Sequence, residues 1–132
     1  MITVQQDEDL TIKISNIPMP PSINQAYKNV GNRRCLARCA IQWYKIFMTE
    51  MKLHTYQMVD KKELAIGGVF YFKYPKKSDT SNYTKLLWDG LQKSGVIRND
   101  NRFYWELLSK NKAQDGEEPY VDLTIKPIGE KL

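Results

Sequence analysis

The stretch that decides the fold is ELAIGGVFYFKYPKKSDTSNYTKLLWDGLQKSG, residues 63–95. Its first half is rich in aromatic and β-branched residues and ends at a proline, which predicts a strand. The pair Gly67-Gly68 within it predicts a bulge. Its second half, from about Ser81 to Ser94, repeats apolar residues at helical spacing and is followed by Gly95, a common helix stop. A strand, a turn and a helix are therefore predicted in succession.

Further elements are predicted on both sides of this unit. Residues 9–17, DLTIKISNI, alternate apolar and polar side chains and predict a first strand. Residues 18–34 contain three prolines and Gly31, which predicts a long irregular connection. An amphipathic helix is expected from Leu36 to about Val59, and two closing strands at residues 102–110 and 119–128. The order β-α-β-α-β-β predicts one α+β domain over residues 1–132, a mixed sheet packed with two main helices.

Composition limits the classes of function. The chain has 132 residues, 42% of them hydrophobic, and 20 Lys plus Arg against 15 Asp plus Glu, a net charge of +5. This excess favours a polyanionic partner such as nucleic acid. No apolar run approaches the roughly 20 residues that span a bilayer, and the first residues lack the pattern of a signal peptide. A cytoplasmic protein without a membrane partner is expected.

The two cysteines do not predict a disulfide or a zinc site. Cys35 and Cys39 are four residues apart at the start of the predicted first helix, where their Cβ atoms are too far apart for a disulfide. A Cys/His zinc site would need more ligands, and His54 is the only histidine. Free thiols are expected.

Two aspartates flank the second helix. Asp79 lies in the connection that precedes it, and Asp100 lies in the turn that follows it. If the next strand pairs with the strand before the helix, the two carboxylates could converge at one end of the sheet. Mg²⁺ can be held by one or two carboxylates together with a phosphate. Lys85 would then offset the charge that develops on the phosphate.

A purely structural interpretation of the same residues remains open. Asp79, like the serines around it, is a good helix N-cap, and acidic residues are favoured at a helix N-terminus. Lys85 and Asp89 are four apart and can form a surface ion pair, and Asn99-Asp100 is common in turns.

A resemblance that runs from about Leu10 to Ile125 favours the metal-site interpretation. The segment from Asp79 to Asp100 contains DTSN, Lys85, DGL and ND at the spacing of a known signature, and MPPSINQAY precedes it. Together these elements resemble the RusA-type Holliday junction resolvases, which have Asp-x-Asp-Asn, a lysine, an Asp-Ala-Leu-like triplet and a final acidic pair. A Pro-Pro-Ser-x-Asn-x-x-Tyr loop after the first strand completes the family pattern.

The resemblance implies a RusA-like fold and a homodimer that binds four-way DNA junctions and cuts them with Mg²⁺ or Mn²⁺, in DNA recombination and repair. It implies that Asp79, Lys85 and Asp100 are catalytic, with Asp79 and Asp100 as metal ligands. The family's second aspartate is replaced by Ser81. Further support for the metal is expected from Ser81, Asn82 and Asp89. A second hypothesis is therefore a protein that binds branched DNA with weak or lost cleavage.

The DNA-binding surface is predicted less sharply. Basic residues surround the proposed metal site, although each of them could also be an ordinary surface charge. The side chain of Trp88 is expected to point away from the apolar face of the second helix, where it either stacks on an unpaired base or forms a dimer contact. Arg33, Arg34 and Arg38 could also approach DNA, in a direction that the sequence does not fix. The expected DNA contacts are Lys76, Lys77, Trp88, Lys93, Arg98 and Arg102.

Overall fold

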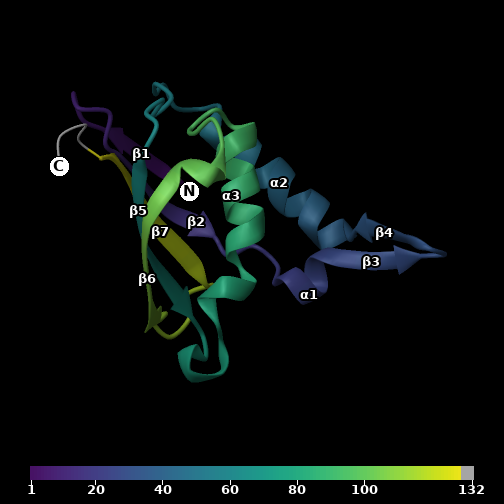
Figure 1. Ribbon diagram of the computed structural model, residues 1–132. Helices are drawn as coiled ribbons and strands as arrows, with labels where there is room; N and C mark the ends of the chain where they lie inside the picture. The colour runs from purple at the N-terminus through teal and green to yellow at the C-terminus, as the bar shows by residue number, and fades with distance from the viewer. Residues whose placement is uncertain (129–132) are drawn as a thin grey trace.

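The computed structural model describes residues 1–128, which form a five-stranded sheet and a separate two-stranded hairpin. The sheet order is β1-β2-β7-β5-β6, and the hairpin pairs β3 with β4 (Figure 1). None of the described helices is long and apolar enough to cross a membrane. The sheet strands are β1 Thr3–Gln6, β2 Ile12–Pro18, β5 Leu64–Phe72, β6 Phe103–Lys112 and β7 Tyr120–Pro127. The remaining elements are α1 Ile23–Ala26, β3 Tyr27–Val30, β4 Arg33–Leu36, α2 Arg38–Met51 and α3 Thr84–Lys93.

The core lies between one face of the sheet and the two long helices. Every second residue of β5 from Leu64 to Phe72 is buried, and α2 and α3 cover that face, whereas no helix of residues 1–128 covers the opposite face (Figure 1). Gly90 allows the two helices to approach closely, because a Cβ there would lie 3.1 Å from the ring of Phe47. A larger residue here would therefore require the Phe47 ring to shift by a few tenths of an ångström.

The strand pairing makes the sheet mixed, as predicted. β5 and β6 are parallel and are joined through α3, whereas the other neighbouring strands in the sheet are antiparallel. β6 is the edge strand, so one side of its backbone is unpaired in the described chain. The register shift between β5 and β6 lies at Leu64/Ala65 and leaves Tyr104 of β6 unpaired, whereas Gly67 and Gly68 pair in regular register, so the predicted bulge at Gly67-Gly68 is wrong. Gly68 instead makes room for Leu123, whose Cδ2 would lie 3.0 Å from an added Cβ.

The α+β class is confirmed, but several element boundaries differ from the predictions. β1 was not predicted, and residues 18–34, predicted to be irregular, contain α1, β3 and the start of β4. The first long helix ends at Met51 rather than near Val59. Cys35 belongs to β4 and only Cys39 to α2, although both thiols are free as expected. The second long helix starts at Thr84, after two short 3₁₀ turns at Pro75–Lys77 and Thr80–Asn82.

Candidate functional site

The segment that leaves β5 folds over the edge strand β6 and forms a shallow depression with it. The two 3₁₀ turns that follow the proline at the end of β5 hold this segment against the second half of β6. The depression has a volume of about 410 Å³ and is open to solvent. Its lining residues are Lys76, Lys77, Ser78, Asp79, Thr80, Leu108, Ser109 and Lys110.

Asp79 is the carboxylate of this depression. Its Oδ1 accepts a hydrogen bond from the backbone N–H of Ser81 at 3.0 Å, so Asp79 caps the second 3₁₀ turn. Hydrogen bonding from the backbone and then the side chain of Ser81, with a smaller contribution from the charge of Lys110, holds the pKa of Asp79 below its ordinary value. The side chain is exposed, and the backbone N–H of Ser81 bonds to Oδ1 and not to Oδ2. An ionised carboxylate oxygen is therefore free for a ligand.

Three lysines line the same depression as this carboxylate. Lys76 and Lys77 are exposed and come from the first 3₁₀ turn, so they lie near Asp79 in the structure. Lys110 comes from β6, and its Nζ donates a hydrogen bond to the backbone oxygen of Ser78 at 2.8 Å. Sequence reasoning did not select Lys110, because only the pairing of β6 with β5 brings it here. A carboxylate among ammonium groups can serve a cation and a phosphate together.

Asp100 lies at the other end of β6. Because β5 and β6 are parallel, Phe103 pairs with Leu64 at the start of β5 and Lys112 pairs with Phe72 at its end. From Phe103 to Lys110 the strand advances about 23 Å, at about 3.3 Å per residue. The prediction that Asp79 and Asp100 converge in one chain is therefore wrong. Residues 1–128 contain no group of three or more Asp, Glu, His or Cys side chains that could hold a metal.

Lys85 and Asp89 belong to a polar cluster on α3 that does not line the depression. Lys85 Nζ lies 3.8 Å from Asp89 Oδ2, which accepts a hydrogen bond from the hydroxyl of Tyr44 at 3.4 Å. Lys93 Nζ lies 4.0 Å from the centroid of the Tyr44 ring. Burial, and then the charge of Asp89, raises the pKa of Tyr44, so this phenol stays protonated. The ion pair that the structural interpretation expected is present.

Three further predicted residues differ in how exposed they are to a ligand. Trp88 is 7% exposed and packs edge-on against Phe103, with 5.4 Å between ring centroids, so the prediction that it stands off the apolar face is wrong. Ser81 is exposed beside Asp79, whereas Asn82 is half-buried and donates its backbone N–H to the backbone oxygen of Asp79. Ser81 is thus the better placed of these two to support a ligand.

Arg98 and Arg102 are held by Asp60. Arg98 Nη2 lies 2.9 Å from Asp60 Oδ2, and Arg102 Nη1 lies 3.1 Å from Asp60 Oδ1. Arg102 also donates to the backbone oxygen of Lys61 at 3.2 Å. The cluster ties the segment before β5 to the start of β6. Both guanidinium groups therefore have a structural partner, which weakens the prediction that they bind DNA.

Comparison with known proteins gives two findings. A family model described as "Endodeoxyribonuclease RusA" matches residues 18–126. The chain is also 24% identical, over 125 residues, to "Crossover junction endodeoxyribonuclease RusA" of Aquifex aeolicus (strain VF5). That alignment covers 95% of this chain and 97% of the relative.

The Asp60 cluster predicts a pH-dependent contribution to stability. Hydrogen bonds from Arg98, and then the charges of both arginines, keep the pKa of Asp60 below its ordinary value. A depressed carboxyl pKa stabilises the fold above the unfolded-state pKa, and this stabilisation is lost as the pH falls through the folded-state pKa. We expect Asp60→Asn to lower the melting temperature by about 1 to 4 °C at neutral pH, and the difference to disappear in strong acid.

Thermal unfolding followed by circular dichroism across this pH range checks the expectation. Glu8→Gln, which removes an exposed carboxylate that has no ion pair within residues 1–128, is the control and should match the wild type throughout. A deficit of Asp60→Asn that stays constant from neutral to strongly acidic pH would contradict the assignment.

Proposed function

The chain belongs to the RusA family of endodeoxyribonucleases, and from this premise we propose that it resolves four-way DNA junctions by metal-dependent phosphodiester hydrolysis. The observation that carries the proposal is the depression that the ionised, exposed Asp79 lines together with three lysines. The process served is DNA recombination and repair, in which such junctions arise. The whole described chain acts as one nuclease domain.

Within one chain, the depression provides only some of the oxygen ligands that a site for Mg²⁺ or Mn²⁺ needs. Asp79 offers one carboxylate with a free oxygen, and Ser81 offers a nearby hydroxyl. Mg²⁺ accepts one or two carboxylates together with substrate phosphate and several waters. A bound ion would supply polarisation of the scissile phosphate. A second carboxylate is needed for a site like that implied by the family signature, and Asp100 of the same chain lies at the far end of β6.

The lysines that line the depression bind DNA rather than the metal. Lys76, Lys77 and Lys110 attract and orient the phosphate backbone, because ammonium groups bind phosphate oxygens without regard to sequence. Lys110 also holds the turn that carries Asp79, through its bond to Ser78. Lys85, in the first turn of α3, does not line the depression, so its proposed role in stabilising charge on the phosphate requires DNA that also covers the start of α3, where Asp89 lies 3.8 Å from its ammonium group.

We infer that the protein is a homodimer and that β6 forms its interface. Tyr104, Trp105 and Leu107 on this strand are 63%, 70% and 78% exposed. An edge strand of ten residues with exposed large apolar side chains is a surface that natural proteins usually cover. A two-fold axis through β6 also suits a junction of near two-fold symmetry, which needs two paired cuts.

Such an axis would complete the metal site. A two-fold axis perpendicular to β6 reverses the strand direction between the two copies. The start of the partner's β6 then lies toward the end of this chain's β6, where Asp79 and Lys110 are located. Asp100 of the partner subunit could in this way supply the carboxylate that the depression lacks. Each cleavage site is then built from Asp79 of one subunit and Asp100 of the other.

Removal of either carboxylate should abolish cutting without loss of binding. We expect Asp79→Asn and Asp100→Asn each to reduce Mg²⁺-dependent cleavage of a synthetic four-way junction by at least about 100-fold, since a metal ligand is lost. Junction affinity in a chelator should be unchanged or slightly higher, because a negative charge beside phosphate is removed. Asn caps a helix about as well as Asp, so the Asp79→Asn fold should persist. Wild-type cleavage rates in both variants would end the assignment.

The second candidate function is binding of branched DNA without efficient cleavage, and Ser81 is the observation that favours it. Ser81 stands next to the carboxylate of Asp79, at the position where the family signature has a second aspartate. The two candidates differ in the response to Ser81→Asp within the same cleavage assay. If the wild-type protein cuts junctions and the Ser81→Asp variant cuts them faster at low Mg²⁺, the protein is a weakened nuclease. Wild-type protein that binds junctions but never cuts them fits the binding protein.

The dimer interface can be tested by charge insertion. We expect Trp105→Glu combined with Leu107→Glu to give a monomer by light scattering, because two carboxylates would be buried in the interface. Cleavage should be lost with the dimer. Leu53→Glu, a substitution of another side chain that is 66% exposed, is the control and should leave the dimer intact. A wild-type monomer that cuts junctions, or a charged variant that remains dimeric, would refute the β6 interface.

A further inference from the structure

The hairpin formed by β3 and β4 projects from the body of the protein. Figure 1 shows it extending beyond α1 and the first turn of α2, away from the sheet. Tyr27 pairs with Leu36 at its base and Val30 with Arg33 at its tip. Gly31 takes the first of the two loop positions with a φ of 62°, where a tight two-residue turn of this kind requires glycine. The hairpin is thus a short, well-defined ribbon.

This ribbon contributes little to the core. All residues from Lys28 to Arg34 are exposed, and only its base is tied down. The backbone N–H of Ala37 donates to the oxygen of Ala26 at 2.7 Å, and the thiol of Cys39 donates to the oxygen of Gln25 at 3.4 Å. A two-stranded hairpin with no hydrophobic face is marginal in water. Its presence therefore needs an explanation other than folding.

The ribbon is strongly basic. No aspartate or glutamate occurs between Asp9 and Glu50 in the sequence. Lys28, Arg33 and Arg34 form no ion pair with any residue in the described part of the chain. Their charges are therefore free to meet a polyanion.

The strand register places these charges on both faces of the ribbon. Residues directly opposite each other in an antiparallel pair lie on the same face, and successive residues alternate. Lys28 and Arg33 therefore share one face, and Arg34 lies on the other with Tyr27. The guanidinium of Arg34 lies 4.5 Å from the centroid of the Tyr27 ring, which fixes its direction near the base.

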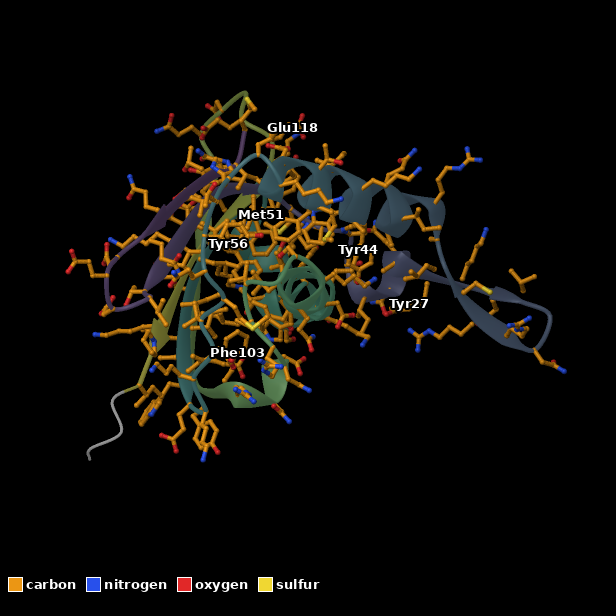
Figure 2. All side chains as sticks on the ribbon, turned by 90° about the horizontal axis from the view of Figure 1, so that it is seen from above. Tyr27, Tyr44, Met51, Tyr56, Phe103 and Glu118 are labelled. Atoms are coloured by element: carbon orange, nitrogen blue, oxygen red, sulfur yellow. The ribbon has the colours of Figure 1, made fainter. Side chains whose placement is uncertain are left out.

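We propose that the β3–β4 hairpin is a DNA-binding arm that grips the phosphate backbone of a duplex, away from the depression that contains Asp79. The inference rests on the proposed function for the identity of the polyanion. A two-stranded ribbon fits the major groove of B-DNA, which is about 12 Å wide, and cations on both faces then meet both phosphate walls. Figure 2 shows the hairpin as a slender extension, with Tyr27 at its base and Tyr44 on the neighbouring α2.

The arm has a continuous connection to the body. The base of the hairpin is bonded to the start of α2, and farther along α2 the ring of Tyr44 is covered by Lys93 of α3. A duplex that lies along the hairpin would therefore continue over Lys93. The contacts are predicted to be with phosphates, so they should serve any duplex and not only a junction.

The test compares two variants with the same change of charge. The first combines Lys28→Gln, Arg33→Gln and Arg34→Gln in the hairpin. The control combines Lys52→Gln, Lys61→Gln and Lys62→Gln, which are exposed residues between the C-terminal end of α2 and β5. Binding of a blunt duplex and of a four-way junction is measured in EDTA over a range of salt, and junction cleavage is measured with saturating protein and Mg²⁺.

The hairpin variant should bind both DNAs at least about tenfold more weakly near 0.1 M salt, and its slope of log affinity against log salt should be shallower by about 2 to 3. Affinities of variant and wild type should converge at high salt, which a folding defect would not produce. Cleavage at saturation and the melting temperature should match the wild type.

Equal binding by the hairpin variant and the control would overturn the inference and leave the proposed nuclease intact. If the wild type binds duplex DNA through the hairpin but never cuts junctions, the inference that the hairpin binds DNA is supported and the proposed nuclease function is refuted. Absence of binding to either DNA by the wild type would overturn both.

Discussion

The parallel pairing of β5 with the edge strand β6 is the constraint on which the rest of the structure depends. It requires the chain to cross from the end of β5 back to the start of β6, and α3 makes this crossing while it seals the core with α2. The segment that leaves β5 then lies beside the second half of β6. Asp79 and Lys110, which are distant in sequence, are brought together by this arrangement.

The same constraint separates residues that the sequence places in one motif. Asp79 follows β5 and Asp100 precedes β6, and in a parallel pair these positions are at opposite ends. In a single chain the depression is therefore lined by one carboxylate and three lysines, a charge pattern better suited to gathering phosphate than to holding a metal alone. The need for a second carboxylate and the exposed apolar side chains of β6 point to the same arrangement, a dimer in which each subunit completes the site of the other.

The sequence predicted what local patterns control. Alternation and helical spacing identified β2, β5, α3 and the two closing strands, and the motif around Asp79 identified the segment that forms the depression. It missed what depends on strand pairing: the direction of β6 relative to β5, the approach of Lys110, and the ion pairs of Asp60. Trp88 was misplaced because its packing partner Phe103 belongs to a distant strand. The hairpin was missed because prolines before it resemble an irregular loop, although Gly31 marks its turn.

Subunit mixing tests most directly the claim that Asp79 and Asp100 act together across the dimer. Asp79→Asn protein and Asp100→Asn protein, each inactive alone, are combined, allowed to exchange subunits and assayed for Mg²⁺-dependent cutting of a four-way junction. A site shared between subunits is intact once in every mixed dimer, because Asp79 of one subunit meets Asp100 of the other. A shared site predicts that the mixture regains cutting of one strand. A mixture that exchanges subunits and stays as inactive as either variant would contradict it.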